Sequence, residues 1–295
     1  MFEQLKAWAL RRYYRFVSAR SWKGHSSSIH WGGISIPASG GPIQGRIYNA
    51  AGGADQPVIV FFHGGGWVIG DLETHHPFCL ELSDKTECTV IAVDYRLAPE
   101  HRFPAAADDC LAAVKWIADK IGDFGPSNGK LVIAGDSAGG NLAAATCLAL
   151  DATLRQQVTG ALLIYPAIDD YDAGHTSYVE RAKSQPLTTD LMRWFWGTYL
   201  GKGGKQTAAA AGAFPLQAQN LDTLPPTLLV TAEFDPLRDE GIALAEKLRA
   251  AGVALNYRHF DQGAHGFASS NGPNADHQAL LAMITEWPAS LTAGG

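Results

Sequence analysis

The stretch "LVIAGDSAGGNLAAATCLAL", residues 131–150, joins a run of β-branched residues to a run of good helix formers. The first favours a buried strand and the second a helix. Gly135 and Gly139 flank Ser137 in a G-x-S-x-G pattern, and a β-carbon at either glycine of a tight strand-to-helix turn would collide with the neighbouring strand or helix. The stretch therefore predicts that Ser137 projects from a strained turn at the carboxyl end of a strand.

The same alternation of strand and helix extends along most of the chain. Continuous apolar runs are typical of strands that are buried on both faces, and helical spacing lies between them. This alternation predicts an α/β fold with a mostly parallel, doubly wound sheet. The expected strands are residues 58–62, 89–93, 131–134, 161–164, 227–231 and 253–260.

Two segments, residues 1–36 and 170–212, interrupt the alternation. The second contains Leu191, Trp194 and Phe195 at helical spacing. Two interpretations stay open for this aromatic helix, ordinary core packing and a cap over a binding pocket. We expect a helical cap from residues 1–36 and 170–212, and an α/β catalytic domain from residues 37–169 and 213–295.

Composition limits the class of protein. With 295 residues, 46% hydrophobic and 18% charged, the chain can bury one large core. A net charge of −6 disfavours nucleic acid as a partner, because phosphate binding needs a basic surface. Charged residues interrupt every apolar stretch near the N-terminus, so we predict no signal peptide and no membrane span, and a cytoplasmic protein. The sequence leaves open whether the chain forms a homodimer.

Residues 5–16 have the pattern of an amphipathic helix. Leu5, Trp8, Ala9, Tyr13 and Phe16 recur at helical spacing. Such a helix either packs on the protein's own surface or lies on a membrane.

The cysteines and clustered histidines do not predict a metal site or disulfides. The four cysteines lack a C-x-x-C pair and stand in apolar or helical contexts, which is typical of reduced core residues. His75, His76 and Cys79 lie close together, but no second pair of ligand-type residues follows them. We predict neither a metal ion nor a cofactor.

A serine hydroxyl attacks efficiently only when a base removes its proton, so a histidine must reach Ser137. His265 follows the final strand in a loop flanked by Gly263 and Gly266, and such a loop can place an imidazole over the sheet edge. His259 lies within a strand and His277 begins a helix. His265 is therefore the predicted base.

The base needs a carboxylate that fixes its tautomer and stabilises the imidazolium. Asp235 directly follows the strand at 227–231, which places it at the same edge as Ser137. Glu233 and Asp239 are competitors, although Asp239 can instead cap the next helix. We take Asp235 as the predicted acid.

The stretch "HGGGW", residues 63–67, offers backbone N–H groups without side chains. Attack on an ester carbonyl creates an oxyanion, whose charge must meet hydrogen-bond donors already in place. We assign this role to the N–H groups of Gly65, Gly66 and Ala138. His63 is expected to hold the loop in place and not to act as the base.

Taken together, these motifs resemble the hormone-sensitive-lipase-like family of α/β-hydrolases, family IV of the bacterial carboxylesterases and lipases. The resemblance covers roughly residues 58–290. It implies the triad Ser137, Asp235 and His265, in the chain order of α/β-hydrolases, and a helical cap. The motifs are "HGGGWVIGD" at 63–71, "DYRLAPEHRFPAA" at 94–106, "GDSAGG" at 135–140, "EFDPLRDEG" at 233–241 and "GAHGF" at 263–267.

The sequence thus predicts a carboxylesterase that hydrolyses small esters of short or medium acyl chains through an acyl-enzyme. Amide or lactone hydrolysis at the same site is the nearest alternative, and a ligand-binding protein on a hydrolase fold is the more distant one. Apolar residues near the motifs or in the expected cap are the candidates for substrate contact. They are Trp67, Met192, Phe195 and Phe267.

Overall fold

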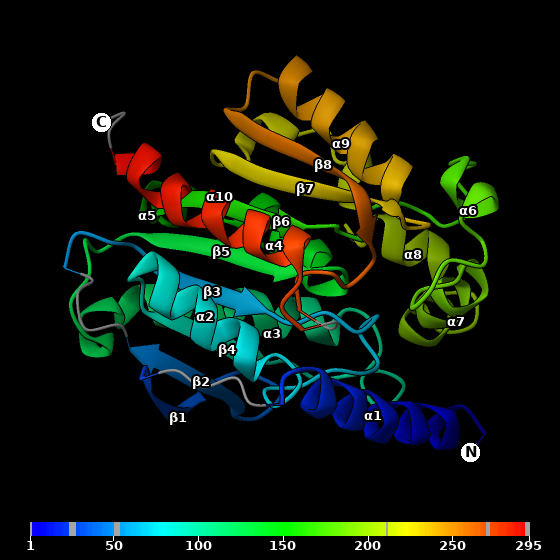
Figure 1. The fold of residues 1–295 in the computed structure, drawn as a ribbon, viewed down its shortest axis with the longest axis horizontal. Helices are drawn as coiled ribbons and strands as arrows, with labels where there is room; N and C mark the ends of the chain where they lie inside the picture. The colour runs from blue at the N-terminus through cyan, green and yellow to red at the C-terminus, as the bar shows by residue number, and fades with distance from the viewer. Residues whose placement is uncertain (1, 24–27, 50–53, 211, 270–271, 293–295) are drawn as a thin grey trace.

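The computed structural model describes residues 2–23, 28–49, 54–210, 212–269 and 272–292. In this part of the chain one eight-stranded sheet forms the centre, with the strand order β1-β2-β4-β3-β5-β6-β7-β8 (Figure 1). Only β1–β2 and β2–β4 pair antiparallel. The predicted α/β class and mostly parallel sheet are confirmed. The strands are β1 His30–Ile36, β2 Ile43–Asn49, β3 Val58–Phe62, β4 Val90–Asp94, β5 Leu131–Asp136, β6 Val158–Ile164, β7 Thr227–Phe234 and β8 Leu255–Ala264.

The edge strand β1 differs from the expectation that residues 1–36 belong to a helical cap. His30–Ile36 pairs with β2 along its whole length, with Trp31 opposite Tyr48. Its sequence contains Gly32 and Gly33, and four of its seven residues are exposed. Strand propensity is weak in such a segment, so local sequence does not reveal a strand that its partner stabilises.

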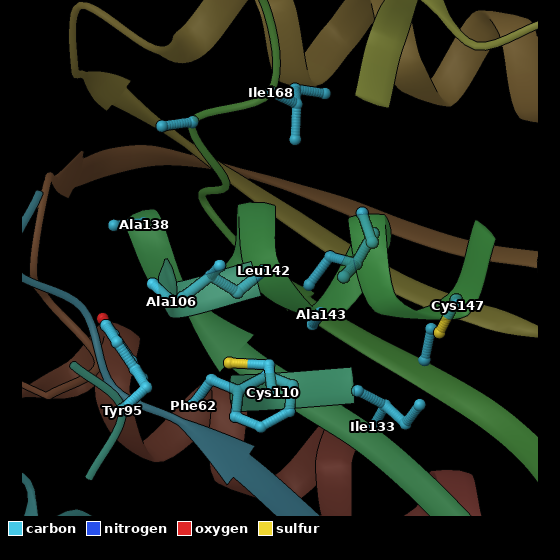
Figure 2. Close-up of a cluster of buried hydrophobic side chains, with 14 of the residues drawn as sticks. Phe62, Tyr95, Ala106, Cys110, Ile133, Ala138, Leu142, Ala143, Cys147 and Ile168 are labelled. Atoms are coloured by element: carbon cyan, nitrogen blue, oxygen red, sulfur yellow. The ribbon is translucent and has the colours of Figure 1, made fainter. Parts of the chain in front are cut away.

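Helices cover both faces of the sheet. Alternate residues of the central strands point to opposite sides, so Ile59 and Phe61 contact one layer while Val60 and Phe62 contact the other. Figure 2 shows part of the second layer, in which Leu142 belongs to the same cluster as Phe62. The first layer contains α2 His76–Thr86 and α10 Ala275–Thr292, and the second contains α3 Ala105–Asp119, α4 Ala138–Ala149 and α9 Arg238–Ala250. Shorter elements are α5 Ala152–Gln157 and the 3₁₀ turns η1 Ile121–Phe124, η2 Pro215–Gln217 and η3 Leu221–Thr223.

Four helices lie beyond the carboxyl ends of the parallel strands (Figure 1). These helices are α1 Phe2–Ser21, α6 Ser177–Glu180, α7 Thr189–Leu200 and α8 Lys205–Ala210. Arg11 ties α1 to the sheet domain by donating to the carbonyls of Val68, at 2.8 Å, and Ala98, at 2.9 Å. Arg102 links α1 to α7 by donating to Glu3 and to the carbonyl of Thr198. No described helix combines the length and the apolar character that a bilayer crossing requires.

Candidate active site

Ser137 stands at the turn between β5 and α4. Its φ of 55° lies in the left-handed region, and its N–H donates to the carbonyl of Ile164 at 2.9 Å. A β-carbon at Gly139 would lie 1.9 Å from the carbonyl oxygen of Phe62, and one at Gly135 would lie 2.3 Å from that of Gly139. Only glycine therefore allows the helix to start this close to the sheet, which fixes the Ser137 hydroxyl at the carboxyl edge.

The structure brings Ser137, His265 and Asp235 together although they are far apart in the chain. Nε2 of His265 lies 2.9 Å from Oγ of Ser137, and Nδ1 lies 2.7 Å from Oδ2 of Asp235. The other Asp235 oxygen accepts the N–H of Leu237 at 2.9 Å. All three residues are buried. Each follows the carboxyl end of a parallel strand, β5, β7 or β8, and these ends meet at one edge.

The two competing carboxylates take part in other contacts. Glu233 contacts Arg181 and Arg238 and lies 3.1 Å from Nε2 of His259. Asp239 accepts the N–H of Ser177 at 2.7 Å and lies in the first turn of α9, so it does not have the capping position that the sequence suggested. Neither carboxylate contacts His265.

The glycine-rich loop after β3 lies beside Ser137. Gly65 has a φ of +118°, and a β-carbon there would lie 2.2 Å from the carbonyl oxygen of Ile69. No hydrogen bond among the described residues occupies the N–H groups of Gly65, Gly66 or Ala138. Three unused donors therefore lie near Ser137.

His63 packs at the start of this loop and holds it in place through contacts with Tyr95 and Gly64. Its ring stacks on Tyr95, with centroids 4.3 Å apart, and Nδ1 lies 2.8 Å from the carbonyl oxygen of Gly64. The hydroxyl of Tyr95 donates to the carbonyl of His63 at 2.6 Å. Burial, followed by the neighbouring His75, lowers the pKa of His63 to about 4. This imidazole is therefore neutral near pH 7, which agrees with a structural role.

Asp136 has a role that the sequence analysis did not assign. Its Oδ1 accepts the N–H of Gly64 at 2.8 Å, and its Oδ2 accepts the hydroxyl of Ser269 at 2.8 Å. Nε2 of His75 lies 3.2 Å from Oδ1. Burial alone would raise the pKa of Asp136, but His75, Ser269 and Gly64 outweigh it, and the net shift is downward. The ionised carboxylate thus connects the glycine-rich loop after β3 to the loop that carries His265.

A cavity of about 190 Å³ opens above Ser137 and His265. Met192 and Phe195, two of the four predicted contact residues, line it. Trp67 does not, because it is buried against Tyr199 with ring centroids 4.6 Å apart. Phe267 is also outside the lining, because it packs in the core against other aromatic rings. The apolar lining consists of Leu10, Tyr13, Tyr14 and Val17 from α1, Ile69, Pro186 and Leu187 from loops, and Leu191, Met192 and Phe195 from α7.

Two further observations concern the rest of the described chain. A larger hollow of about 550 Å³ lies between α3, α4 and the end of α7, but it is lined by none of Ser137, Asp235 and His265. In the described ranges no three His, Cys, Asp or Glu side chains are arranged to hold a metal ion, and the four cysteines are free and buried. The first cavity is therefore the candidate active site.

A sharp turn that carries serine, a buried histidine and carboxylate, and a glycine loop with free N–H groups define an α/β-hydrolase site. Sequence comparison agrees, because the family described as "alpha/beta hydrolase fold" matches residues 59–269. The chain belongs to this family, which confirms the resemblance seen in its motifs.

Curated relatives and solved structures refine this assignment. The chain is 41% identical over 265 residues to the carboxylic ester hydrolase LipN of Mycobacterium tuberculosis, covering 85% of this chain and 70% of that protein. It is 37% identical over 258 residues to the esterase LipI of the same organism, covering 85% and 80%. A hyperthermophilic esterase from Pyrobaculum calidifontis superposes with a TM-score of 0.87 at 38% identity, covering 97% and 91%.

Proposed function

We propose that this α/β-hydrolase is a carboxylesterase that cleaves esters of short to medium acyl chains through a covalent acyl-enzyme. One observation carries the proposal: Nε2 of His265 lies 2.9 Å from the Ser137 hydroxyl while Asp235 lies 2.7 Å from the opposite nitrogen. This arrangement supports proton removal from the hydroxyl during attack. The relatives named as esterases support the same activity.

The mechanism follows from the positions of these groups. As Oγ of Ser137 attacks the ester carbonyl, Nε2 of His265 takes the hydroxyl proton, and Asp235 stabilises the resulting imidazolium. The carbonyl oxygen becomes an oxyanion, which the N–H groups of Gly65, Gly66 and Ala138 bind. His265 then protonates the leaving alcohol, and Ser137 keeps the acyl group. Water repeats the sequence and releases the acid.

The size and lining of the cavity support a preference for small apolar acyl groups. Its volume of about 190 Å³ is below the range typical of drug-sized ligand sites, roughly 300–1,000 Å³. Apolar side chains of α1 and α7 line it, and each methylene that they bury stabilises the bound ester by about 0.8 kcal/mol. We therefore propose a graded chain-length preference that favours short to medium acyl chains.

A series of p-nitrophenyl esters of increasing acyl length tests this function, with the Ser137→Ala variant measured in parallel. We expect rapid turnover of the short esters and, in the variant, a loss of about 10⁶-fold in kcat. A serine-directed phosphonate should label the wild type once, at Ser137. Labelling at another residue, or faster cleavage of matched amides or lactones than of the esters, would overturn the proposal.

A further inference from the structure

The outer face of α1 carries an unusual set of exposed side chains. Leu5, Trp8, Tyr13 and Phe16 are between 56% and 65% exposed, which places four of the seven large exposed apolar side chains of the described residues on this one helix. Its inner face is occupied, because Ala7 and Ser18 are buried against the protein. The rest of the helix is therefore packed, and only this face lacks a partner.

Exposed apolar residues and cations lie together along a single stripe. Counted from Leu5, steps of three or four residues keep the side chains on one face. The sequence along the stripe is apolar, apolar, cationic, apolar, cationic, cationic. Its members are Leu5, Trp8, Arg12, Phe16 and Arg20 on α1 and Lys23 in the turn that follows it, and all six are exposed.

The three cations of this stripe are not neutralised by the protein. Arg12 lies over the ring of Trp8, at 5.2 Å from its centroid, and no carboxylate among the described residues pairs with Arg12, Arg20 or Lys23. By contrast, Arg15 pairs with Asp71, and Arg11 pairs with Glu100. The charge of the stripe is therefore available to a partner.

Charge is also unevenly distributed along the chain. Residues 1–23 contain six Lys or Arg and only one carboxylate, Glu3, whereas the whole chain contains 23 cations and 29 carboxylates. A basic segment on an otherwise acidic protein favours an anionic partner. Because large apolar side chains lie within the same stripe, that partner must also accept apolar groups.

We propose that the outer face of α1 docks on an anionic lipid surface. In that environment Trp8 and Phe16 reach the boundary between headgroups and acyl chains, while Arg12, Arg20 and Lys23 contact lipid phosphates. A second copy of the chain fits less well. A symmetric contact through the stripe would bring Arg12, near its middle, against the Arg12 of the other copy.

Docking through this face would place the catalytic cavity next to the lipid. Tyr13 is 65% exposed and also lines the cavity, while Leu10, Tyr14 and Val17 line it from the same helix. This consequence depends on the proposed function, because it means that an ester dissolved in the bilayer is close to the cavity mouth. The docking itself does not depend on catalysis.

Flotation with phosphatidylcholine vesicles, prepared with and without phosphatidylglycerol, tests the proposal on the full chain. We expect binding only to the vesicles that contain phosphatidylglycerol, and weaker binding at high salt. The double variants Trp8→Ser/Phe16→Ser and Arg12→Glu/Arg20→Glu should each reduce binding by about tenfold or more. Val179→Ser removes an even more exposed apolar side chain, 79% exposed, from α6 and should leave binding unchanged.

Turnover of a water-soluble ester is measured on every protein. Because the substituted residues do not line the catalytic cavity, all variants should retain the turnover of the wild type. Vesicle binding without any ester turnover would leave the docking intact and reject the proposed function. Absence of wild-type binding, or unchanged binding by either double variant, would overturn the docking. Loss of a dimer in Trp8→Ser/Phe16→Ser, seen by sedimentation without vesicle binding, would instead assign the face to a second copy.

Discussion

The floor and the roof of the catalytic cavity are held in different ways. The floor consists of the loops at residues 63–66, 136–138 and 265–266, which follow the strands, and backbone atoms and buried hydrogen bonds fix it. The roof consists of α1 and residues 186–195, which place mainly apolar side chains over the same cavity. Three ion pairs of α1, Arg11 with Glu100, Arg15 with Asp71 and Arg102 with Glu3, tie the roof to its surroundings.

Under the proposed function, this difference assigns the reaction rate to the floor and the substrate preference to the roof. In the floor, a shift of a few tenths of an ångström would move a donor or the base away from Ser137, so few residue types are tolerated there. In the roof, several apolar side chains can fill the same space with modest changes in free energy. We therefore expect substitutions in the floor to change the rate, and substitutions in the roof to change the preferred substrate.

Among substitutions that leave Ser137, Asp235 and His265 in place, the largest effect is expected when a side chain is added to the floor. In Gly65→Ala the new β-carbon would lie 2.2 Å from a backbone oxygen, and alanine disfavours the φ of +118°. The oxyanion loop must shift, and the loss of one donor should lower kcat by about 10²–10³. Steady-state kinetics with a short p-nitrophenyl ester measures this loss.

Gly197→Ala is the matched control, in the part of α7 that follows the roof. A β-carbon at Gly197 meets no heavy atom within 4 Å, and the residue lies within the helix α7. Its kcat should remain close to that of the wild type. If the two alanine variants were equally active, the glycine loop would not set the position of the oxyanion donors.

A smaller loss is expected when the loop is loosened indirectly. In Asp136→Asn the side chain can still accept from Gly64, but it loses its charge beside His75 and its acceptor for Ser269. We expect kcat to fall by about 10² with a smaller change in KM, and the free energy of unfolding to fall by about 3 kcal/mol.

Kinetics and denaturant unfolding measure these two quantities for Asp136→Asn. Asp119→Asn serves as the control, because the side chain of Asp119 is 73% exposed and should affect neither quantity. A variant at Asp136 that loses stability but keeps its kcat would show that the carboxylate supports the fold without positioning the loop.

The sequence predicted the floor far better than the roof. A G-x-S-x-G turn and three consecutive glycines are local patterns with few alternative explanations, and a parallel sheet necessarily brings its strand ends to one edge. Trp67 and Met192 were both predicted to contact the substrate, yet only Met192 lines the cavity. Which apolar side chain faces a cavity depends on how helices pack, and local sequence does not determine this packing.

Asp136 and the strand β1 show the same limit within the sheet domain. The partners of Asp136 are His75, 61 residues away, and Ser269, 133 residues away, so no local spacing could reveal its role. β1 has weak strand propensity and is stabilised by pairing with β2. Both features depend on contacts between distant parts of the chain.

Burial also makes the floor sensitive to acid. The folded protein lowers the pKa of His63 to about 4, below its ordinary value of about 6.5. Above that ordinary value neither state binds the proton. As the pH falls further, the unfolded chain takes up the proton first, so stability is lost until the folded state also titrates. For His63 alone this loss is about 2 kcal/mol at pH 5.

Chemical denaturation at pH 7.5 and pH 5 isolates this contribution through the His63→Gln variant. The variant loses the stacking on Tyr95 and is less stable overall, but its free energy of unfolding should fall about 2 kcal/mol less than that of the wild type between the two pH values. His101→Gln changes an exposed histidine and should follow the wild type. A parallel fall in wild type and His63→Gln would mean that His63 is not held neutral.

The smallest effect is expected in the roof, where Phe195→Ala should alter selectivity more than rate. The ring of Phe195 packs directly on the floor, since a β-carbon at Gly66 would lie 2.2 Å from it. Its removal extends the cavity beside Ser137 without altering the backbone donors. Each additional methylene buried there contributes about 0.8 kcal/mol, so kcat/KM for longer acyl chains should rise about fourfold per methylene relative to the wild-type profile.

Trp194→Ala is the control. It removes the neighbouring aromatic ring, which Lys6 covers at 4.0 Å and which does not line the cavity. Its chain-length profile should match that of the wild type, and an equal shift in both variants would mean that selectivity depends on the stability of α7 and not on the space beside the nucleophile.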